Sequence, residues 1–272
     1  MLISLLLTAC TDPMEIALSQ PAEARKMVWG FQSLDGEQWG APLPVASGLS
    51  SLGLAATDGA LLVTGIQELR PPGWIEGLVG APVWGLRFDG QQWHPHRWRV
   101  WDRQTPAFID PQPFEGTMWY LSREDSAIHN ADPAQADGVS IRSASPVTVR
   151  WQGAELADPS PIRHDGVLHV FATAGRDVLH LAGEPLAEVE RLPGVTVPFA
   201  LRFRDQLTLL AQRRHSGRRQ PVISQHDGAG WSAWRPLVDL HSLHNCTSPV
   251  MGPHPTGGWV LLCVEERRQE EP

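Results

Sequence analysis

Short apolar runs recur along the whole chain, each bounded by Gly, Pro or Asp. Runs of about four to eight apolar residues between turn residues indicate strands, because helices need longer periodic stretches. Five segments share one order, in which small residues lead into a turn and then into a strongly apolar strand. They begin at Ser51, Thr105, Asp158, Thr196 and Thr247. The pattern therefore predicts an all-β protein with five pairs of adjacent strands.

A second short pattern alternates with these pairs. It consists of a hydrophobic or aromatic residue, any residue, Gly, two further residues and a large apolar residue. The copies are LDGEQW (34–39), FDGQQW (88–93), WQGAEL (151–156), LAGEPL (181–186) and HDGAGW (226–231). Asp-Gly occurs in three of them and supplies the positive φ angles of a tight hairpin. A unit repeated at this spacing is typical of a β-propeller.

The two ends of the repeat complement each other. The first Gly hairpin, at 34–39, has no strand pair before it, and the last strand pair, from Thr247, has no Gly hairpin after it. Strands from both termini can therefore complete one blade and cover the edges of the ring. We predict a five-bladed β-propeller over residues 27–266, followed by a frayed charged tail over 267–272. The alternatives are an open β-sandwich and a six-bladed ring with one unrecognised unit.

The amino terminus reads MLISLLLTAC. A Leu three residues before a Cys, followed by small residues, resembles the lipobox of bacterial lipoproteins. The resemblance implies a signal over residues 1–10, a lipidated Cys10 and a tether over 11–26, with acyl chains holding the protein on a membrane. Thr11, where an Asp would direct retention in the inner membrane, implies the outer membrane. The alternative is an N-terminal strand with a buried Cys.

Composition excludes some partners. The formal net charge is −8, whereas nucleic-acid binding needs a basic face. No run reaches the roughly 18 apolar residues of a membrane-spanning helix. We expect a monomer without cofactor that contacts the membrane through its anchor and no nucleic acid. Twelve Trp residues accompany a single Tyr, and most of these Trp side chains are expected at a repeated core position.

Two known propeller families resemble parts of the chain. Asp158-Pro-Ser is similar to the inner-strand starts of the five-bladed glycoside hydrolases of family 43. Ser33 to Trp39 is similar to the sialidase Asp-box, S-x-D-x-G-x-T-W, with one residue fewer, and Ser224 to Trp231 approximates it. The Asp-box is a structural turn, so this second resemblance implies a fold rather than an activity.

The first resemblance makes Asp110 and Asp158 candidate catalytic residues, because glycosidases use two carboxyl groups flanking the scissile bond. The family pattern also expects a Glu on a later inner strand, but Val197 and Ser248 stand at the corresponding positions. Sialidases use a Tyr nucleophile, and Tyr120 lies in an apolar run. The alternative role for Asp110 and Asp158 is to satisfy backbone amides at the strand starts.

Binding groups are expected in long loops on one face of the ring. The segments Gln67–Ala81 and Arg123–Ser145 are interpreted as insertions on that face. The candidate ligand-binding residues are Trp74, Trp101, Asp110, Asp158 and His244. Asp125, Asp132 and Asp137 are candidate Ca²⁺ ligands, although their spacing does not match an EF-hand loop.

Cys246 and Cys263 are candidates for a disulfide. A hairpin centred near His254 and Pro255 would place them directly opposite each other, and an exported protein lies in an oxidising compartment. The alternative is a pair of buried thiols.

These observations predict a lipid-anchored propeller of the cell envelope that binds a glycan or an envelope protein without catalysis. The alternative is a divergent glycoside hydrolase or sialidase-like enzyme.

Overall fold

The computed structural model describes residues 26–57, 59–67, 83–100, 108–122, 127–131, 148–152, 156–238, 243 and 245–266. Strands and the turns between them make up this part of the chain. A search of these residues found no helix with the length and apolarity needed to cross a membrane.

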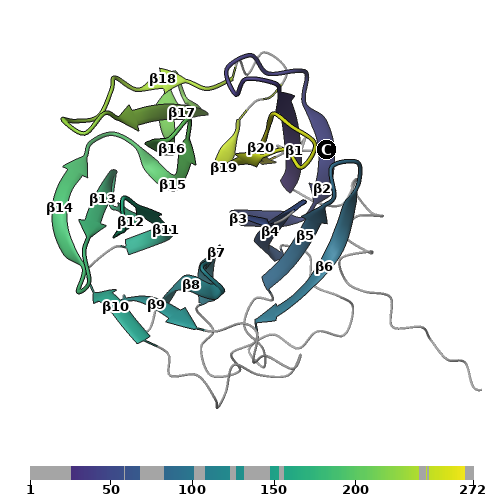
Figure 1. Cartoon of the computed structure of the whole chain (residues 1–272). Helices are drawn as coiled ribbons and strands as arrows, with labels where there is room; N and C mark the ends of the chain where they lie inside the picture. The colour runs from purple at the N-terminus through teal and green to yellow at the C-terminus, as the bar shows by residue number, and fades with distance from the viewer. Residues whose placement is uncertain are drawn as a thin grey trace, which may run out of the picture.

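The strands form five four-stranded antiparallel sheets arranged around a central axis (Figure 1). The first two sheets, each given from the inner to the outer strand, are β3(Leu49–Thr57)–β4(Ala60–Gln67)–β5(Val83–Phe88)–β6(Trp93–Val100) and β7(Phe108–Phe114)–β8(Thr117–Ser122)–β9(Ala127–Ala131)–β10(Thr148–Gln152). The next two are β11(Leu156–His164)–β12(Val167–Ala174)–β13(Asp177–Ala182)–β14(Ala187–Leu192) and β15(Thr196–Phe203)–β16(Gln206–His215)–β17(Arg218–His226)–β18(Arg235–Pro236). The prediction of an all-β propeller is confirmed.

The fifth sheet contains strands from both ends of the described chain. Its order is β19(Thr247–Pro253)–β20(Trp259–Glu266)–β1(Lys26–Ser33)–β2(Leu43–Ser47). β1 runs antiparallel to β20 without interruption, from the Lys26–Glu266 pair to the Ser33–Trp259 pair. The two edges that an open chain of sheets would expose are therefore hydrogen-bonded to each other.

The five predicted strand pairs are confirmed as the two inner strands of each sheet. The second strands are the most continuously buried elements, because neighbouring sheets cover both of their faces. In β16, for example, six consecutive residues from Leu207 to Gln212 are buried. The apolar runs of these strands thus form the core between the sheets.

Every inner strand carries a bulge at the same place. The register of each inner pair shifts there by one residue, and one residue of the bulge has a positive φ. These residues are Ser51, Asp110, Asp158, Val197 and Ser248, with φ between 48° and 55°. Four of the five stand directly before a Pro. The five sheets therefore repeat one local distortion at the end of the axis where the inner strands begin.

The Gly hairpins are confirmed in four of their five copies, which connect the third and fourth strands of their sheets. The turn after Ser33 has the contacts of an Asp-box, since Gly36 N–H donates to Ser33 Oγ over 2.8 Å. The Asp35 carboxylate accepts backbone N–H bonds from Gln38 and Glu37, which lower the pKa of Asp35 to about 2. The assignment of WQGAEL as a hairpin was wrong, because it joins the end of β10 to the start of β11.

The interpretation of Arg123–Ser145 as one loop was also wrong. The short strand β9 lies in the first half of this segment. It divides the segment into one connection before β9 and another after it. Ala127 to Ala131 pair with both β8 and β10 and are thus part of the sheet. This strand carries a weak strand signal, because His129 and Asn130 are polar and only Ile128 is a strong strand former.

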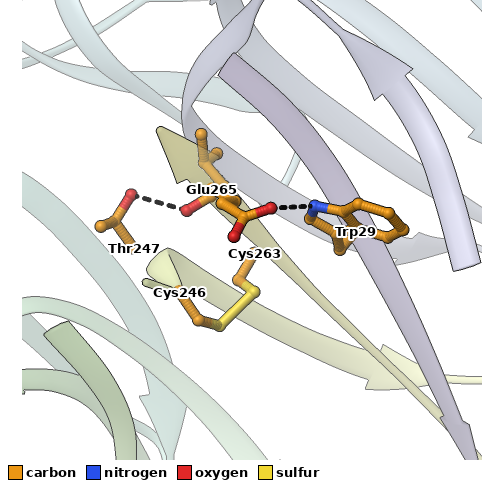
Figure 2. Close-up of a disulfide and its surroundings, with 6 residues drawn as sticks. Trp29, Cys246, Thr247, Cys263 and Glu265 are labelled. Atoms are coloured by element: carbon orange, nitrogen blue, oxygen red, sulfur yellow. Dashed lines mark hydrogen bonds between the residues drawn. A yellow bond between two sulfur atoms is a disulfide. The ribbon is translucent and has the colours of Figure 1, made fainter. Parts of the chain in front are cut away.

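Cys246 and Cys263 are joined by a disulfide, with their Cα atoms 5.3 Å apart (Figure 2). The register predicted for them was wrong. Val250 faces Leu262 and Thr247 faces Val264, so the bulge intervenes and the two Cys residues lie diagonally across the Thr247–Val264 pair. Two glycines with positive φ, Gly257 and Gly258, lengthen the turn and move its centre toward the C-terminus.

Candidate functional site

The positive-φ residues of the five inner strands gather at one end of the axis. They line a pocket together with the residues that follow them, among them Leu52, Pro198 and Pro249. The pocket encloses about 10 Å³, room for about one water molecule. Among the five equivalent positions only Asp110 and Asp158 are ionisable, and they belong to neighbouring sheets. We refer to the two as the carboxyl pair.

The carboxyl pair is in direct contact. Asp158 donates its backbone N–H to Asp110 Oδ2 over 3.0 Å, and the two carboxyl groups are also hydrogen-bonded to each other. Asp110 is 5% exposed, so the pair is shielded from bulk solvent. The bond from Asp158 N–H to Asp110 is the alternative role predicted for these residues, in which a carboxyl group satisfies a backbone amide at a strand start.

Burial, and after it repulsion by Asp110, raises the pKa of Asp158 from 3.8 to about 8. The cause is general, since a low-dielectric site disfavours the charged form and two adjacent carboxylates cannot both ionise cheaply. Asp158 therefore holds a proton at neutral pH, and the pair carries at most one negative charge.

Thr173 extends the carboxyl pair into a chain of hydrogen bonds. Its hydroxyl on β12 donates to Asp158 Oδ2 over 2.7 Å and accepts the backbone N–H of Val197 over 2.8 Å. Asp110, Asp158 and Val197 lie on the inner strands of three consecutive sheets, so the chain links those sheets around the axis. Thr173 was not among the predicted site residues, because nothing in its local pattern marks a Thr on an apolar strand as a partner of a carboxyl group.

The arrangement limits what the carboxyl pair can do chemically. Glycosidases hold their two carboxyl groups about 5–5.5 Å or about 6.5–9.5 Å apart, with the sugar or a water between them. Here the groups are hydrogen-bonded to each other, and Ser51, Val197 and Ser248 occupy the three other equivalent positions. Within the described inner strands, the Glu expected from the family-43 pattern is absent.

A larger cavity of about 360 Å³ opens at the opposite end of the axis, where the inner hairpins turn. Its volume is in the range of small-ligand pockets. Phe114, Ile162 and Trp259 supply apolar surface, and Glu115 and Arg202 stand at its margin. Binding was predicted on the other face of the ring. This cavity could not be predicted, because it arises only when five hairpins are placed in a ring.

Several predicted site residues lie outside the described part of the chain. These are Cys10, Trp74, Trp101, Asp125, Asp132, Asp137 and His244. Within the described residues no group of three or more His, Cys, Asp or Glu side chains is arranged to hold a metal ion. Tyr120 is 5% exposed in the core, as its apolar surroundings predicted.

No family model matches the sequence, and neither does a curated protein. The fold is similar to that of solved glycoside hydrolases. An exo-β-1,3-galactanase from Phanerochaete chrysosporium has a TM-score of 0.53 at 10% sequence identity, over 85% of this chain and 64% of that chain. An exo-1,5-α-L-arabinanase from a bovine ruminal metagenomic library has a TM-score of 0.50 at 11% identity, over 80% of this chain and 92% of that chain. At such identities the similarity establishes the propeller fold alone.

Proposed function

We propose that the protein is a carbohydrate-active five-bladed propeller, whose ligand lies across the face around Asp110 and Asp158. The observation that carries the proposal is the carboxyl pair, which places the ionisable residues of the five equivalent positions side by side at the axis. Perturbed carboxyl groups gathered on a scaffold axis are typical of functional sites. The similar solved structures are named as glycan-cleaving enzymes, which supports a carbohydrate as the ligand.

Hydrolysis is the activity that the comparisons favour. The proton on Asp158 supports it, because a glycosidase needs an acid that is still protonated at neutral pH. Asp158 would protonate the departing glycosidic oxygen, and the Asp110 carboxylate would take a proton from the attacking water. The products would be two sugars with one water added across the broken bond.

Binding without cleavage is the second candidate, and the geometry of the site favours it. The contact between the two carboxyl groups leaves no room for a glycosidic oxygen, and the pocket beside them is smaller than a sugar ring. A glycan would then rest on the face, with Asp110 and Asp158 serving as hydrogen-bond partners.

The two activities separate in one experiment. The purified protein is incubated with β-1,3-galactan, arabinan and a broad set of other glycans, and both binding and release of reducing sugar are measured. Loss of release by about 100-fold or more in Asp110→Asn and Asp158→Asn, with Arg202→Gln unchanged at the other end of the axis, would establish hydrolysis. Binding without release would establish a binding protein. If a folded protein neither binds nor cleaves any glycan, the proposal is wrong.

We further propose that Cys10 carries the lipid anchor and that the propeller is held as a monomer at the outer membrane. The short apolar run ending in Leu7-Thr-Ala-Cys10 supports this assignment. Mass spectrometry of the protein from cells tests it. A diacylated Cys10 at the mature terminus is the expected result, and an unmodified Met1 from a verified start codon would refute it.

A further inference from the structure

The hairpin of β16 and β17 extends beyond the sheet to which it belongs. β15 pairs with β16 only as far as the Thr196–Gln212 pair, and β18 pairs with β17 only at Val222 and Ile223. Residues 213–220 therefore form strand pairs only with one another, as a two-stranded projection, and we call residues 213–219 of it the basic ribbon.

The basic ribbon is strongly cationic in a protein whose formal net charge is −8. Its sequence, RRHSGRR, contains Arg213, Arg214, Arg218 and Arg219, and three of these arginines are exposed, with Arg213 half-buried. Across the described part of the chain, none of the four guanidinium groups forms an ion pair, whereas Arg163, Arg191, Arg202 and Arg204 all do.

Like charges face each other across the ribbon. Arg214 is directly opposite Arg219. Directly opposed like charges destabilise an antiparallel pair. An anion bound between two such guanidinium groups would replace this repulsion with charge-assisted hydrogen bonds, for which the planar guanidinium is well suited.

The ribbon is also held in place. The Arg219 backbone N–H donates to Asn245 Oδ1 over 2.9 Å, and its carbonyl accepts the N–H of Cys246 over 3.0 Å. Cys246 is bonded to Cys263 in the fifth sheet. The cationic groups thus project from a base that is fixed to two sheets, as binding groups on a preorganised scaffold do.

The ribbon rises at the end of the axis that carries the carboxyl pair. Gln212, the residue before it, pairs with Thr196, and the next residue, Val197, lines the pocket beside Asp158. A chain lying across this face can therefore reach the axial pocket and the ribbon together.

We infer that the basic ribbon binds the acidic groups of a polyuronate, so that the carbohydrate of the proposed function is an anionic one. This inference rests on the proposed function for the ligand being a glycan. An anionic membrane surface could also attract the ribbon, because the chain enters β1 at Lys26 on the same end. A broad anionic surface would, however, also repel the rest of this acidic protein, whereas a single acidic chain can contact the ribbon alone.

The test compares three probes on the full chain at about 0.15 M salt, where long-range attraction is screened. They are polygalacturonate, the same polymer with its carboxyl groups reduced to alcohols, and vesicles of equimolar phosphatidylcholine and phosphatidylglycerol. The variant is Arg214→Gln/Arg219→Gln. Arg202→Gln/Arg204→Gln removes the same charge from the opposite end of the same sheet and serves as the control. Thermal unfolding verifies that both variants are folded.

The expected result is binding of polygalacturonate that weakens by about tenfold or more in the ribbon variant and little in the control. The reduced polymer should bind about as weakly to the wild type as the acidic polymer does to the ribbon variant. Equal binding of both polymers, equal loss in both variants, or ribbon-dependent binding to the vesicles alone would overturn the inference. Binding of neutral glycans that depends on Asp110 but not on the ribbon would leave the proposed function standing and refute only the anionic ligand. If polyuronate binding instead depends on the ribbon and is unchanged in Asp110→Asn and Asp158→Asn, that result would support the anionic ligand, refute the proposed site and place the ligand away from the carboxyl pair.

Discussion

Trp231 donates its indole N–H to the Glu190 carboxylate over 2.7 Å, although the two residues belong to neighbouring sheets. Glu190 also lies 3.0 Å from His180 Nδ1, and His180 Nε2 lies 2.9 Å from His169 Nδ1. Because a neutral imidazole donates through one nitrogen and accepts through the other, His180 donates to Glu190 and accepts from His169. A row of four side chains thus joins the second, third and fourth strands of one sheet to the next sheet.

Acid should weaken this row. Burial lowers the pKa of His180 and lowers that of His169 to about 4, with further repulsion by His180, His164 and His226, opposed by Asp165. In the unfolded chain both rings titrate near 6.5. The unfolded state therefore binds more protons below that pH, and the two rings subtract stability as pH falls from about 6.5 toward 4. Because Asp158 contributes with the opposite sign over this range, thermal unfolding between pH 8 and pH 5 is compared in the wild type and in His169→Gln. The variant should lose less stability on acidification than the wild type, and an equal pH dependence in the two proteins would contradict the assignment.

Trp231→Phe should destabilise the protein through its lost hydrogen bond. The expected cost in free energy of unfolding is about 1–2 kcal/mol, because the Glu190 carboxylate loses a donor. Trp234 packs against the same core cluster as Trp231 and provides the matched control. Urea unfolding of both Phe variants measures the difference, and equal losses would show that packing alone accounts for Trp231.

Thr173→Val should be costly although it preserves shape. The substitution leaves the Val197 N–H without its acceptor and Asp158 Oδ2 without its hydroxyl donor, for an expected loss of about 1–3 kcal/mol. Thr173→Ser keeps both bonds and should retain most of the stability. If Thr173→Ser and Thr173→Val prove equally destabilising in urea unfolding, the lost hydrogen bonds of the hydroxyl would not explain the loss of stability.

Asp158→Asn should stabilise the protein at alkaline pH. The folded-state pKa of Asp158 is raised to about 8, so the folded state binds the extra proton and stability falls as pH rises from about 4 to about 8. The amide is neutral and can donate to Asp110 as the protonated acid does. At pH 9 we expect a gain on the order of 1–3 kcal/mol over the wild type in urea unfolding, shrinking at pH 5. A variant that is less stable than the wild type at both pH values would contradict the protonated state of Asp158.

Reduction of the disulfide should lower stability by about 3 kcal/mol. Cys246 and Cys263 are 17 residues apart, and a loop of this length removes about that much entropy from the unfolded chain. Cys246→Ala/Cys263→Ala should unfold at a lower temperature than the oxidised wild type and be insensitive to reductant. A reduced wild type that melts at the oxidised temperature would show that the hairpin is held by packing alone.

The repeated strand pairs could be predicted from the sequence, whereas the contacts between side chains far apart in the chain could not. The strand pairs follow from apolar runs such as Leu207 to Leu210, whose burial on both faces leaves a signal in the local pattern. The Asp110 to Asp158 contact was foreseen only as a shared position on inner strands, because its distance depends on the angle between two sheets. Thr173 and the row from Trp231 to His169 were missed because their partners are 10 to 41 residues away in the sequence.

Errors of register have a separate cause. The hairpin between β19 and β20 was predicted from its apolar residues, but the bulge at Ser248 and the long turn at Gly257 each shift the pairing. A shift of one or two residues does not change which residues are apolar, so the pattern cannot detect it. The Cys pair was nevertheless identified, because a diagonal and a direct pair both lie within disulfide reach.

The pairing of β1 with β20 has a consequence for how the protein is made. The partners Lys26 and Glu266 are the last to meet during synthesis, since more than four fifths of the described chain lies between them. Until β20 emerges from the ribosome, Val28 and Phe31 lack most of the core that buries them, and the edge of β1 is open to any passing strand. Strand pairing over such a separation also forms slowly, because the entropy of closing the long loop is lost before the contacts between the strands can stabilise it. A nascent chain of this protein therefore needs shielding at its first strand until its last is complete.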